Sequence, residues 1–330
     1  MYGTTVTNRM FKRFYHVTSR SNERKDVFIS QTDRERYFSY LGSVTELYGR
    51  ELRERYYMQN TMKQLLKDWL PPVLIKWICR IRHKSFVGPF ESWNDAQEQS
   101  LGYNSDIILR KCKNAMLKIV SGEAVYERDS VVFDKIQHSF PVLAGLLHAV
   151  NVHVGRVSVL DFGGSLGSSY YQCRSFLPGL KSLRWSIVEQ PKFVECGREF
   201  FETEQLKFYY DIDECLNSEK PELVLLSGVL EYIERPYDLM KDIVARNFQY
   251  IILDRTPVVE LESDILTVQK VPKEIYEASF PCRFISEKQL LSCFAIQYEI
   301  LGEWESFETC VLGRIRAQSK GYIFKNVSMS

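Results

Sequence analysis

A short acidic and glycine-rich stretch, VSVLDFGGSLGS from Val157 to Ser168, constrains the fold more than any other part of the chain. Its β-branched and apolar residues predict a buried strand, which ends in Asp161 and runs at once into glycines. A buried strand that passes through a glycine turn into a helix is typical of the ligand-binding corner of a doubly wound α/β fold. The stretch therefore predicts a mostly parallel sheet with a binding site at its carboxyl edge.

The acid at the end of this strand indicates which ligand the corner accepts. A dinucleotide would place its pyrophosphate over the turn, where the carboxylate of Asp161 repels it. S-adenosylmethionine (SAM) has no phosphate and carries an ammonium and a sulfonium, which a carboxylate attracts. We expect the methionine end of SAM to be surrounded by Asp161, Gly163, Gly164, Ser165 and Gly167, with the glycines admitting the ligand close to the backbone. The alternative is a bare glycine turn before a helix.

Further polar residues follow the next two predicted strands. Glu189 ends the run WSIVE about 20 residues or somewhat more downstream, where such folds place an acceptor for the ribose hydroxyls. Its neighbour Gln190 is predicted to line the adenine pocket. Asp211 and Asp213 follow the third strand, and they either accept the adenine amino group or form a solvated acidic turn.

Composition and charge are those of an ordinary globular chain. The 330 residues are 45% hydrophobic and 26% charged, which suffices for about two domains with a sizeable core. The net charge of +1 produces no global field that would gather nucleic acid. The eight cysteines form no CxxC pair and lie at no metal-ligand spacing with a histidine, so we expect no metal and a reducing cytoplasm. The polar, basic start Met1–Arg13 does not read as a signal peptide.

From residue 155 the chain alternates strand-like and helix-like segments. Strands are predicted at 157–160, 185–188, 207–210, 223–226, 250–253, 298–301 and 322–324. Helices are predicted between them at 168–176, 192–201, 236–245 and 287–293. This alternation predicts an α/β fold with a doubly wound, seven-stranded, mostly parallel sheet, helices on both faces and the last two strands at an antiparallel edge.

The segments before residue 155 differ in character from this domain. We divide the chain into residues 1–60, a largely helical cap or lid region at 61–154, and a SAM-binding domain at 155–330. Helix starts are expected at Ser92 and Ser105, and an apolar helix at 141–150.

Several blocks carry a family resemblance: GPFESW (88–93), GEAVYERDSVVFD (122–134), VLDFGGSLGSSYYQCR (159–174), VEQPKFVECG (188–197), LLSGVLEYIERP (225–236), LDRTP (253–257), TVQKVP (267–272) and YEASFPCRFIS (276–286). From about residue 87 to 330 the chain resembles a family of class I SAM-dependent methyltransferases encoded in bacterial surface-polysaccharide gene clusters. The resemblance implies a Rossmann-like fold, SAM as cofactor and a sugar or sugar-nucleotide as methyl acceptor. The third glycine of the class I pattern is Ser165 here.

A second resemblance lies near the amino terminus. The segments YHVTSR (15–20), NERK (22–25) and DRERY (33–37), with the run to Gly49, resemble the amino-terminal part of REP-associated tyrosine transposases over about residues 15–50. The metal-binding histidine pair and nucleophilic tyrosine of that family do not follow, so residues 1–60 are expected to be catalytically inactive. A DNA-binding, transposase-derived protein and a SAM-fold assembly partner without catalysis are therefore the alternative functions.

Residues at the end of the fourth strand are candidates for the acceptor side of the site. Ser227 and Gly228 permit close approach to the sulfonium. Tyr232 or Glu231 either faces the substrate or belongs to the first turn of a helix, where the dipole favours an acid. Tyr232 is the candidate catalytic residue of this segment.

Two further catalytic candidates come from other segments. Arg255, in the DRTP turn after the fifth strand, either grips a sugar hydroxyl, a carboxylate or a phosphate, or pairs locally with Asp254. His138 is a candidate base for a substrate hydroxyl, because the unperturbed pKa of histidine is about 6.5. The charged cluster Tyr126–Asp134 before it either folds over the cofactor as a lid or forms a salt-bridged helix surface.

The expected partners are small. We expect a small-molecule or glycan acceptor and no specific nucleic acid, and the sequence leaves the oligomeric state open. The stretch Met62–His83 either contacts a membrane surface as an amphipathic element or forms a helix pair split by Pro71 and Pro72. Its apolar window is much shorter than the roughly 20 residues that span a bilayer.

Overall fold

The computed structural model describes residues 86–101, 105–128, 130–133, 136, 138–271 and 278–329. The transposase-like segment and the amphipathic stretch at 62–83 lie outside these described residues. No helix within the described ranges has the length and apolar character needed to cross a bilayer.

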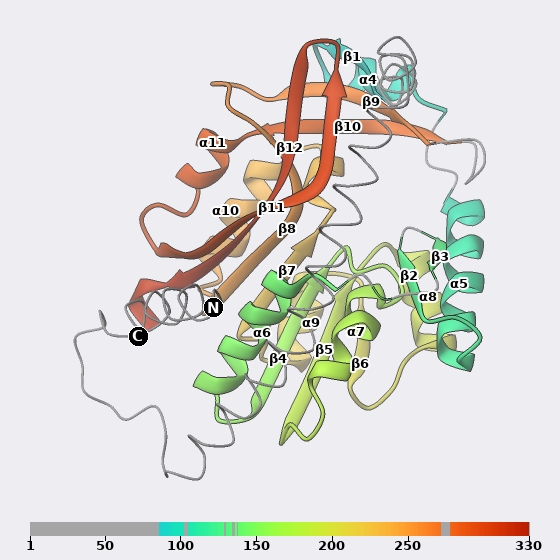
Figure 1. The fold of residues 1–330 in the computed structure, drawn as a ribbon, viewed down its shortest axis with the longest axis vertical. Helices are drawn as coiled ribbons and strands as arrows, with labels where there is room; N and C mark the ends of the chain where they lie inside the picture. Colours follow the sequence, from blue (N-terminus) through green and yellow to red (C-terminus); the bar gives the residue numbers. More distant parts are fainter. Residues whose placement is uncertain are drawn as a thin grey trace, which may run out of the picture. The chain divides into compact units, whose positions relative to one another are not determined.

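The described strands and helices are labelled in Figure 1. The strands are β1 (Phe86–Phe90), β2 (Tyr126–Arg128), β3 (Val131–Phe133), β4 (Arg156–Phe162), β5 (Ser182–Val188), β6 (Leu206–Tyr209), β7 (Leu223–Ser227), β8 (Tyr250–Val259), β9 (Ile265–Lys270), β10 (Ser279–Ser286), β11 (Tyr298–Leu312) and β12 (Ile315–Asn326). The helices are α4 (Trp93–Glu98), α5 (Ser105–Ser121), α6 (Phe140–Val152), α7 (Ser168–Cys173), α8 (Pro191–Phe200), α9 (Ile212–Ser218), α10 (Pro236–Ala245) and α11 (Glu287–Ser292), with the short 3₁₀ turns η2 (Arg174–Phe176), η3 (Leu230–Tyr232) and η4 (Val327–Met329).

Seven strands form the central sheet, in the order β6-β5-β4-β7-β8-β12-β11. The strands β4 to β8 are parallel, whereas β12 lies antiparallel between β8 and β11. This is a doubly wound, Rossmann-like sheet, and it confirms the predicted fold class. Each of the seven predicted strands overlaps one of these observed strands, and the four predicted helices correspond to α7 with η2, α8, α10 and α11.

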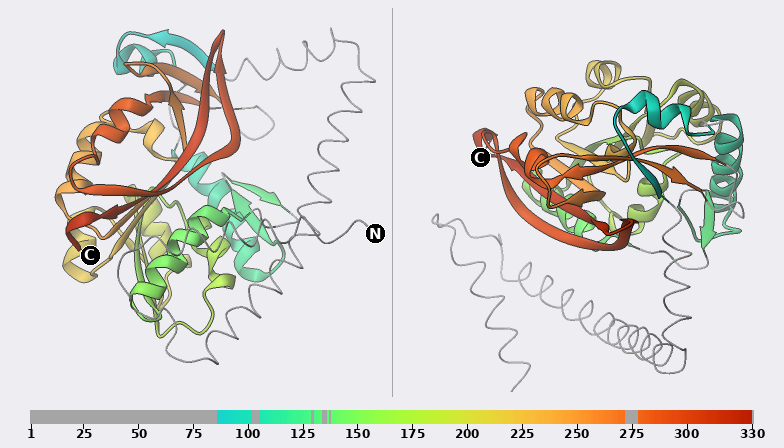
Figure 2. Two further views of the ribbon diagram at one scale, coloured as in Figure 1. Left: turned by 60° about the vertical axis from the view of Figure 1, so that its left-hand side comes forward. Right: turned by 90° about the horizontal axis from the view of Figure 1, so that it is seen from above.

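Helices cover both faces of this sheet (Figures 1 and 2). Successive strand residues point to opposite faces, so each strand contributes to two cores. Val157 and Val159 of β4 belong to the core beneath α6, α7 and α8, whereas Leu160 belongs to the core beneath α9, α10 and α11. The near-continuous apolar sequence of β4 follows from burial on both sides.

An antiparallel extension, β1-β9-β10, was not predicted from the sequence. It joins the central sheet where the end of β10 pairs in parallel with the end of β8, through Ile285 opposite Val258. The described part of the region before residue 155 likewise holds strands β1, β2 and β3 beside the helices α4, α5 and α6. Helix α4 begins at the expected Ser92, whose side chain accepts the backbone N–H of Asp95.

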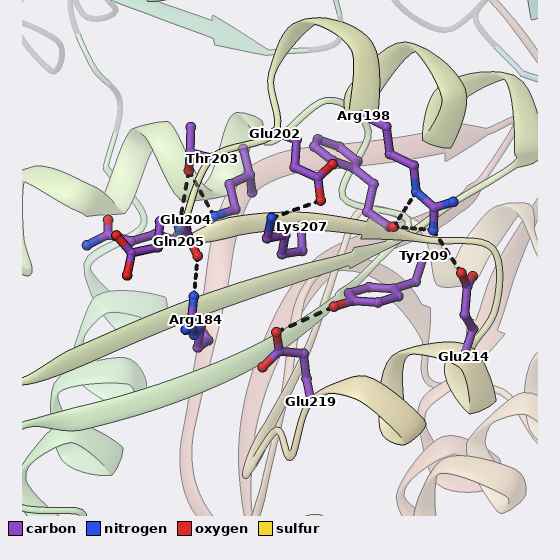
Figure 3. Close-up of polar contacts among 12 residues, drawn as sticks. Arg184, Arg198, Glu202, Thr203, Glu204, Gln205, Lys207, Tyr209, Glu214 and Glu219 are labelled. Atoms are coloured by element: carbon purple, nitrogen blue, oxygen red, sulfur yellow. Dashed lines mark hydrogen bonds and ion pairs between the residues drawn. The ribbon is translucent and has the colours of Figure 1, made fainter.

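Polar contacts hold the edge strand β6 and the turn that follows it (Figure 3). Arg198 of α8 donates from Nε and Nη2 to the carbonyl of Phe208, at 3.0 and 2.8 Å, and from Nη2 to Oε1 of Glu214 at 2.8 Å. The other oxygen of Glu214 accepts the backbone N–H of Tyr210 at 2.7 Å. These contacts place the β6–α9 turn, which carries Asp211, at the carboxyl end of the strand.

The long β11–β12 hairpin has no room for a side chain at Gly321. A methyl group there would lie 2.1 Å from Cζ2 of Trp304, the residue opposite it in the hairpin. At Gly302, in the same hairpin, the nearest atom would be Cδ1 of Ile323 at an ordinary 3.6 Å.

We predict that Gly321→Ala lowers the free energy of unfolding by about 1–3 kcal/mol, because the partly buried indole of Trp304 must move to admit the methyl group. The matched Gly302→Ala variant should change it by less than about 0.5 kcal/mol. Urea unfolding followed by circular dichroism measures both variants. Equal losses in the two would show that the packing of Trp304 on Gly321 is not tight.

Candidate functional site

The winding of the sheet reverses between β4 and β7. Strand β4 pairs with β5 on one side and with β7 on the other. The helix that follows β4, α7, packs on one face, and the helix that follows β7, α10, packs on the other. Open α/β sheets bind ligands at such a switch point, beyond the carboxyl ends of the strands. The predicted residues Asp161, Glu189 and Ser227 lie at these strand ends.

Alternate residues of the loop after β4 adopt left-handed backbone conformations. The φ angles are +71° at Gly163, +54° at Ser165 and +101° at Gly167. Ser165 therefore occupies a conformation that costs a residue with a side chain about 1 kcal/mol. These three positions are those of the class I glycine motif. The motif has glycine at every second residue because those residues adopt left-handed conformations.

A side chain added at either of two glycines in this loop would collide with other atoms of the protein. A methyl group would lie 2.4 Å from Cγ2 of Val229 at Gly163, and 2.6 Å from Oδ2 of Asp161 at Gly164. Besides the ligand approach expected of them, these glycines therefore have a packing role. Glycine is also required by the contact between the β4 and β7 loops and by the position of the Asp161 carboxylate.

Asp161 is a fully buried acid whose carboxylate is held by the neighbouring strand. Nε1 of Trp185 in β5 donates a hydrogen bond of 2.9 Å to Oδ2 of Asp161. Burial raises the pKa of Asp161 to about 7, against the opposing effects of the Trp185 hydrogen bond and the charge of Arg255, while the charge of Glu189 raises it further. The charge of Asp161 therefore changes near neutral pH.

Glu189 lies against the same loop from the end of β5. Its Oε2 accepts the backbone N–H of Gln190 at 2.6 Å, and a hydrogen bond with the backbone of Ser165 ties it to the glycine loop. Burial raises the pKa of Glu189, and these two hydrogen bonds oppose the rise. Gln190 is exposed and precedes the first residue of α8. Two acids, Asp161 and Glu189, thus flank the loop.

The two predicted adenine-side acids have different surroundings. The carboxylate of Asp211 caps α9 by accepting the backbone N–H of Glu214 at 2.7 Å, and it stays at the end of β6. Asp213 is exposed and forms an ion pair of 2.5 Å with Arg246 at the end of α10. Asp213 is therefore a solvated, ion-paired residue in the first turn of helix α9.

A second buried carboxylate, Asp254 in the middle of β8, accepts hydrogen bonds from three other segments. Ser227 donates from Oγ to Oδ2 of Asp254 at 2.8 Å. Oδ1 of the same carboxylate accepts from Oγ of Ser139 at 3.5 Å and from Nε1 of Trp304 at 3.3 Å. Asp254 thereby ties the start of α6 and the hairpin strand β11 to the strand ends. Neither Ser139 nor Trp304 was predicted, because only the tertiary structure brings them to Asp254.

Arg255 lies within β8, not in a turn after the fifth strand as expected, and its φ of +57° is left-handed. Its Nε and Nη2 donate to Oγ and to the carbonyl of Ser227, at 3.4 and 3.3 Å. A methyl group at Gly228, where φ is +64°, would lie 2.8 Å from Nη2. The local contact with Asp254 is longer, at 4.0 Å. The guanidinium therefore lies over Ser227 and Gly228, and the binding role expected of Arg255 stays a prediction.

Tyr232, in the short turn η3, faces the unpredicted extension. Its hydroxyl donates to Oε1 of Gln269 in β9 at 2.8 Å, and its ring packs edge-on against Phe280 of β10, with centroids 5.2 Å apart. Glu231 beside it is buried. The strands β9 and β10 thus reach the edge of the site through Tyr232.

His138 is oriented toward helices. Its ring centroid lies 4.8 Å from that of Phe176 and 5.8 Å from that of Phe140. Burial lowers the pKa of His138, although a hydrogen bond with the backbone of Gln172 opposes this. These contacts lie on α6, α7 and η2, so the structure does not group His138 with the strand-end residues.

The cluster around Tyr126 forms the β2–β3 hairpin, so the expected helix surface is wrong. Glu127 is buried, and its carboxylate accepts hydrogen bonds from Oγ of Ser168 and from the backbone N–H of Ser130, the latter at 2.7 Å. Arg128 pairs with Glu308 of β11 at 3.3 Å. The hairpin therefore packs against the start of α7, beside the glycine loop, and its role as a lid stays a prediction.

Among the described residues, no group of three or more His, Cys, Asp or Glu side chains is arranged to hold a metal ion. The groups gathered at the strand ends are carboxylates, a serine hydroxyl and a guanidinium. These groups bind cations, hydroxyls and carboxylates through charge and hydrogen bonds.

Comparison with known proteins finds similar structures but no matching sequence. No family model matches the chain, and no curated protein matches its sequence. The N-terminal domain of EvdMO1, solved with S-adenosylhomocysteine (SAH) and D-fucose, is 15% identical over 68% of this chain and 97% of that chain, with a TM-score of 0.39. A SAM-dependent methyltransferase from Clostridium acetobutylicum is 11% identical over 65% and 99%, with a TM-score of 0.39. The 1,6-didemethyltoxoflavin-N1-methyltransferase of Burkholderia thailandensis, with bound 1,6-didemethyltoxoflavin and SAH, is 13% identical over 68% of this chain and 91% of that chain, with a TM-score of 0.35.

We predict that Asp161 makes the fold less stable as the pH rises. The pKa of this carboxyl is about 7 in the folded chain and about 3.9 when unfolded, so between these values only the folded state holds the proton. Stability relative to an Asp161→Asn variant should therefore fall by about 4 kcal/mol between pH 4 and pH 8. Urea unfolding at several pH values measures it, with Asp106→Asn at an exposed site as control. A stability difference that is constant with pH would contradict the burial of a titrating Asp161.

Proposed function

We propose that the protein is a SAM-dependent methyltransferase that acts on a sugar or sugar-nucleotide in surface-polysaccharide biosynthesis. One observation carries the cofactor assignment: two acids, Asp161 and Glu189, flank a left-handed glycine loop at the switch point of the sheet. A pyrophosphate would be repelled there, whereas a phosphate-free cation is attracted. The polysaccharide-cluster resemblance of residues 87–330 supports the class of acceptor.

The residues at the strand ends fit SAM by charge. The carboxylate of Asp161 suits the ammonium, and that of Glu189 suits the ribose hydroxyls. Gln190 and Asp211 lie at the ends of β5 and β6, on the side of the site that would receive adenine. Bound in this site, SAM supplies a methyl group that a nucleophile takes from sulfur, which leaves SAH.

The contribution of the chain is orientation. We assign the acceptor side of the site to Ser227 and Gly228 at the end of β7 and to Tyr232 after it. Holding two reactants in line supplies up to about 7–11 kcal/mol of the barrier. An amine or acid acceptor needs no general base. We assign none to His138, whose ring packs against Phe140 and Phe176.

We further propose that the protein works in the cytoplasm. The cysteines of the described residues are free thiols, and most of them are buried. A reducing compartment suits such a set. A small-molecule acceptor that is made in the cytoplasm agrees with this location.

Titration calorimetry tests the cofactor assignment. We predict that SAM and SAH bind, that NAD does not, and that Glu189→Gln weakens SAM binding by about 10- to 100-fold through loss of a charged hydrogen-bond acceptor. The matched variant Glu195→Gln, on the exposed side of α8, should bind SAM like the wild type. Absence of heat and of a thermal shift at millimolar SAM would remove the cofactor assignment.

Incubation with SAM and a panel of sugar nucleotides, with SAH measured as product, tests the acceptor class. We expect SAH to appear with a subset of the sugars. Turnover on a different class of small molecule would support the methyltransferase activity but contradict a sugar as the acceptor. Binding of SAM without turnover on the panel or on cell-envelope extract would favour a noncatalytic assembly partner.

A further inference from the structure

We infer that Arg255 binds the α-carboxylate at the methionine end of SAM, opposite the ammonium held by Asp161. This inference rests on the proposed function. It gives Arg255 a cofactor-binding role in place of the acceptor-binding role expected from the sequence.

Asp161 and Asp254, the residue before Arg255, lie on nearby strands at the carboxyl edge of the parallel sheet. Asp161 of β4 pairs with Leu225 of β7, and Ser227 of β7 pairs with Asp254 of β8. Adjacent strands lie about 4.8 Å apart, so β4 and β8 are about 10 Å apart across β7. Burial, and after it the charges of Asp161 and Asp254, raise the pKa of the Cys173 thiol in α7.

The side chain of Arg255 turns back from β8 toward β4. Its guanidinium lies over Ser227 and Gly228, at the end of the intervening strand β7. The side chain thereby reaches from β8 to β7, which is half of the distance to Asp161 in β4. The remaining distance is about one strand spacing, which the ammonium and carboxylate of one amino acid can bridge.

The charges across this space are complementary to an amino acid zwitterion. The positive charge of Arg255 lowers the pKa of Asp161, so the two groups act on each other across the loop. A carboxylate on one side attracts an ammonium, and a guanidinium on the other binds a carboxylate through two parallel hydrogen bonds. A sugar hydroxyl would use only part of this arrangement, because it is uncharged.

The backbone conformation at Arg255 is irregular, and this irregularity directs its side chain. Arg255 has φ of +57° inside β8, and the pairing of β8 with β12 shifts register at this point, between Tyr322 and Lys320. An irregularity of this kind redirects a side chain at the edge of a binding site. The left-handed conformation costs about 1 kcal/mol or more, and such strain persists where the surrounding structure enforces it.

Decarboxylated SAM provides a direct test, because it keeps the amine, the sulfonium, the ribose and the adenine but lacks the carboxylate. Titration calorimetry should show that the wild-type chain binds SAM about 10- to 100-fold more tightly than decarboxylated SAM. In Arg255→Gln this preference should disappear, with no loss of affinity for decarboxylated SAM. In Arg246→Gln, which removes an arginine at the end of α10, the preference should stay as in the wild type.

The ratio of the two affinities is measured within one variant, so it does not depend on the yield of folded protein. If Arg255→Gln does not fold, Arg255→Lys replaces it, and the preference for SAM should then fall without vanishing. A wild-type ratio in the Arg255 variant overturns this inference and leaves the proposed function standing. A wild-type chain that binds neither compound overturns the proposed function, and the inference with it.

Discussion

The buried carboxylate of Asp161 is the constraint on which the rest of the site depends. An acid with almost no solvent contact is costly unless hydrogen bonds or cations compensate its charge. The chain supplies Trp185 from the next strand and the distant charge of Arg255, yet the pKa of Asp161 still rises to about 7. In the proposed function the cationic cofactor completes this compensation. Gly164 is part of the same arrangement, because any side chain there would strike the carboxylate.

A second carboxylate, Asp254, unites elements that are far apart in the sequence. It receives donors from Ser139 before α6, from Ser227 at the end of β7 and from Trp304 in β11. The same Trp304 packs on Gly321, so the β11–β12 hairpin is held tightly where it meets the strand ends. The position of Arg255 next to this carboxylate thus depends on the whole carboxyl edge of the sheet.

Whether a strand could be predicted from the sequence depended on how its residues are buried. Strands such as β4 are buried on both faces and separated by helices, so continuous apolar runs and regular alternation identified them. The extension was missed because its strands lack this signal: β10 contains Pro281 and Arg283, and a proline within a run argues against a strand. The charged segment at Tyr126 was expected as a lid or a helix surface. The structure makes it a hairpin, since Glu127 satisfies the backbone of Ser130 and the hydroxyl of Ser168.

The sequence by itself determined the order of the central elements, the glycine loop and the two acids that flank it. These features are local: a strand, its turn and the residue at its end are neighbours in the chain, and their spacing carries the information. Only the tertiary structure decided that Asp161 is buried under Trp185, that Asp213 faces Arg246, that His138 packs among helices and that Arg255 turns over Gly228. Burial and electrostatic partners depend on contacts between residues distant in the chain, which no local pattern encodes.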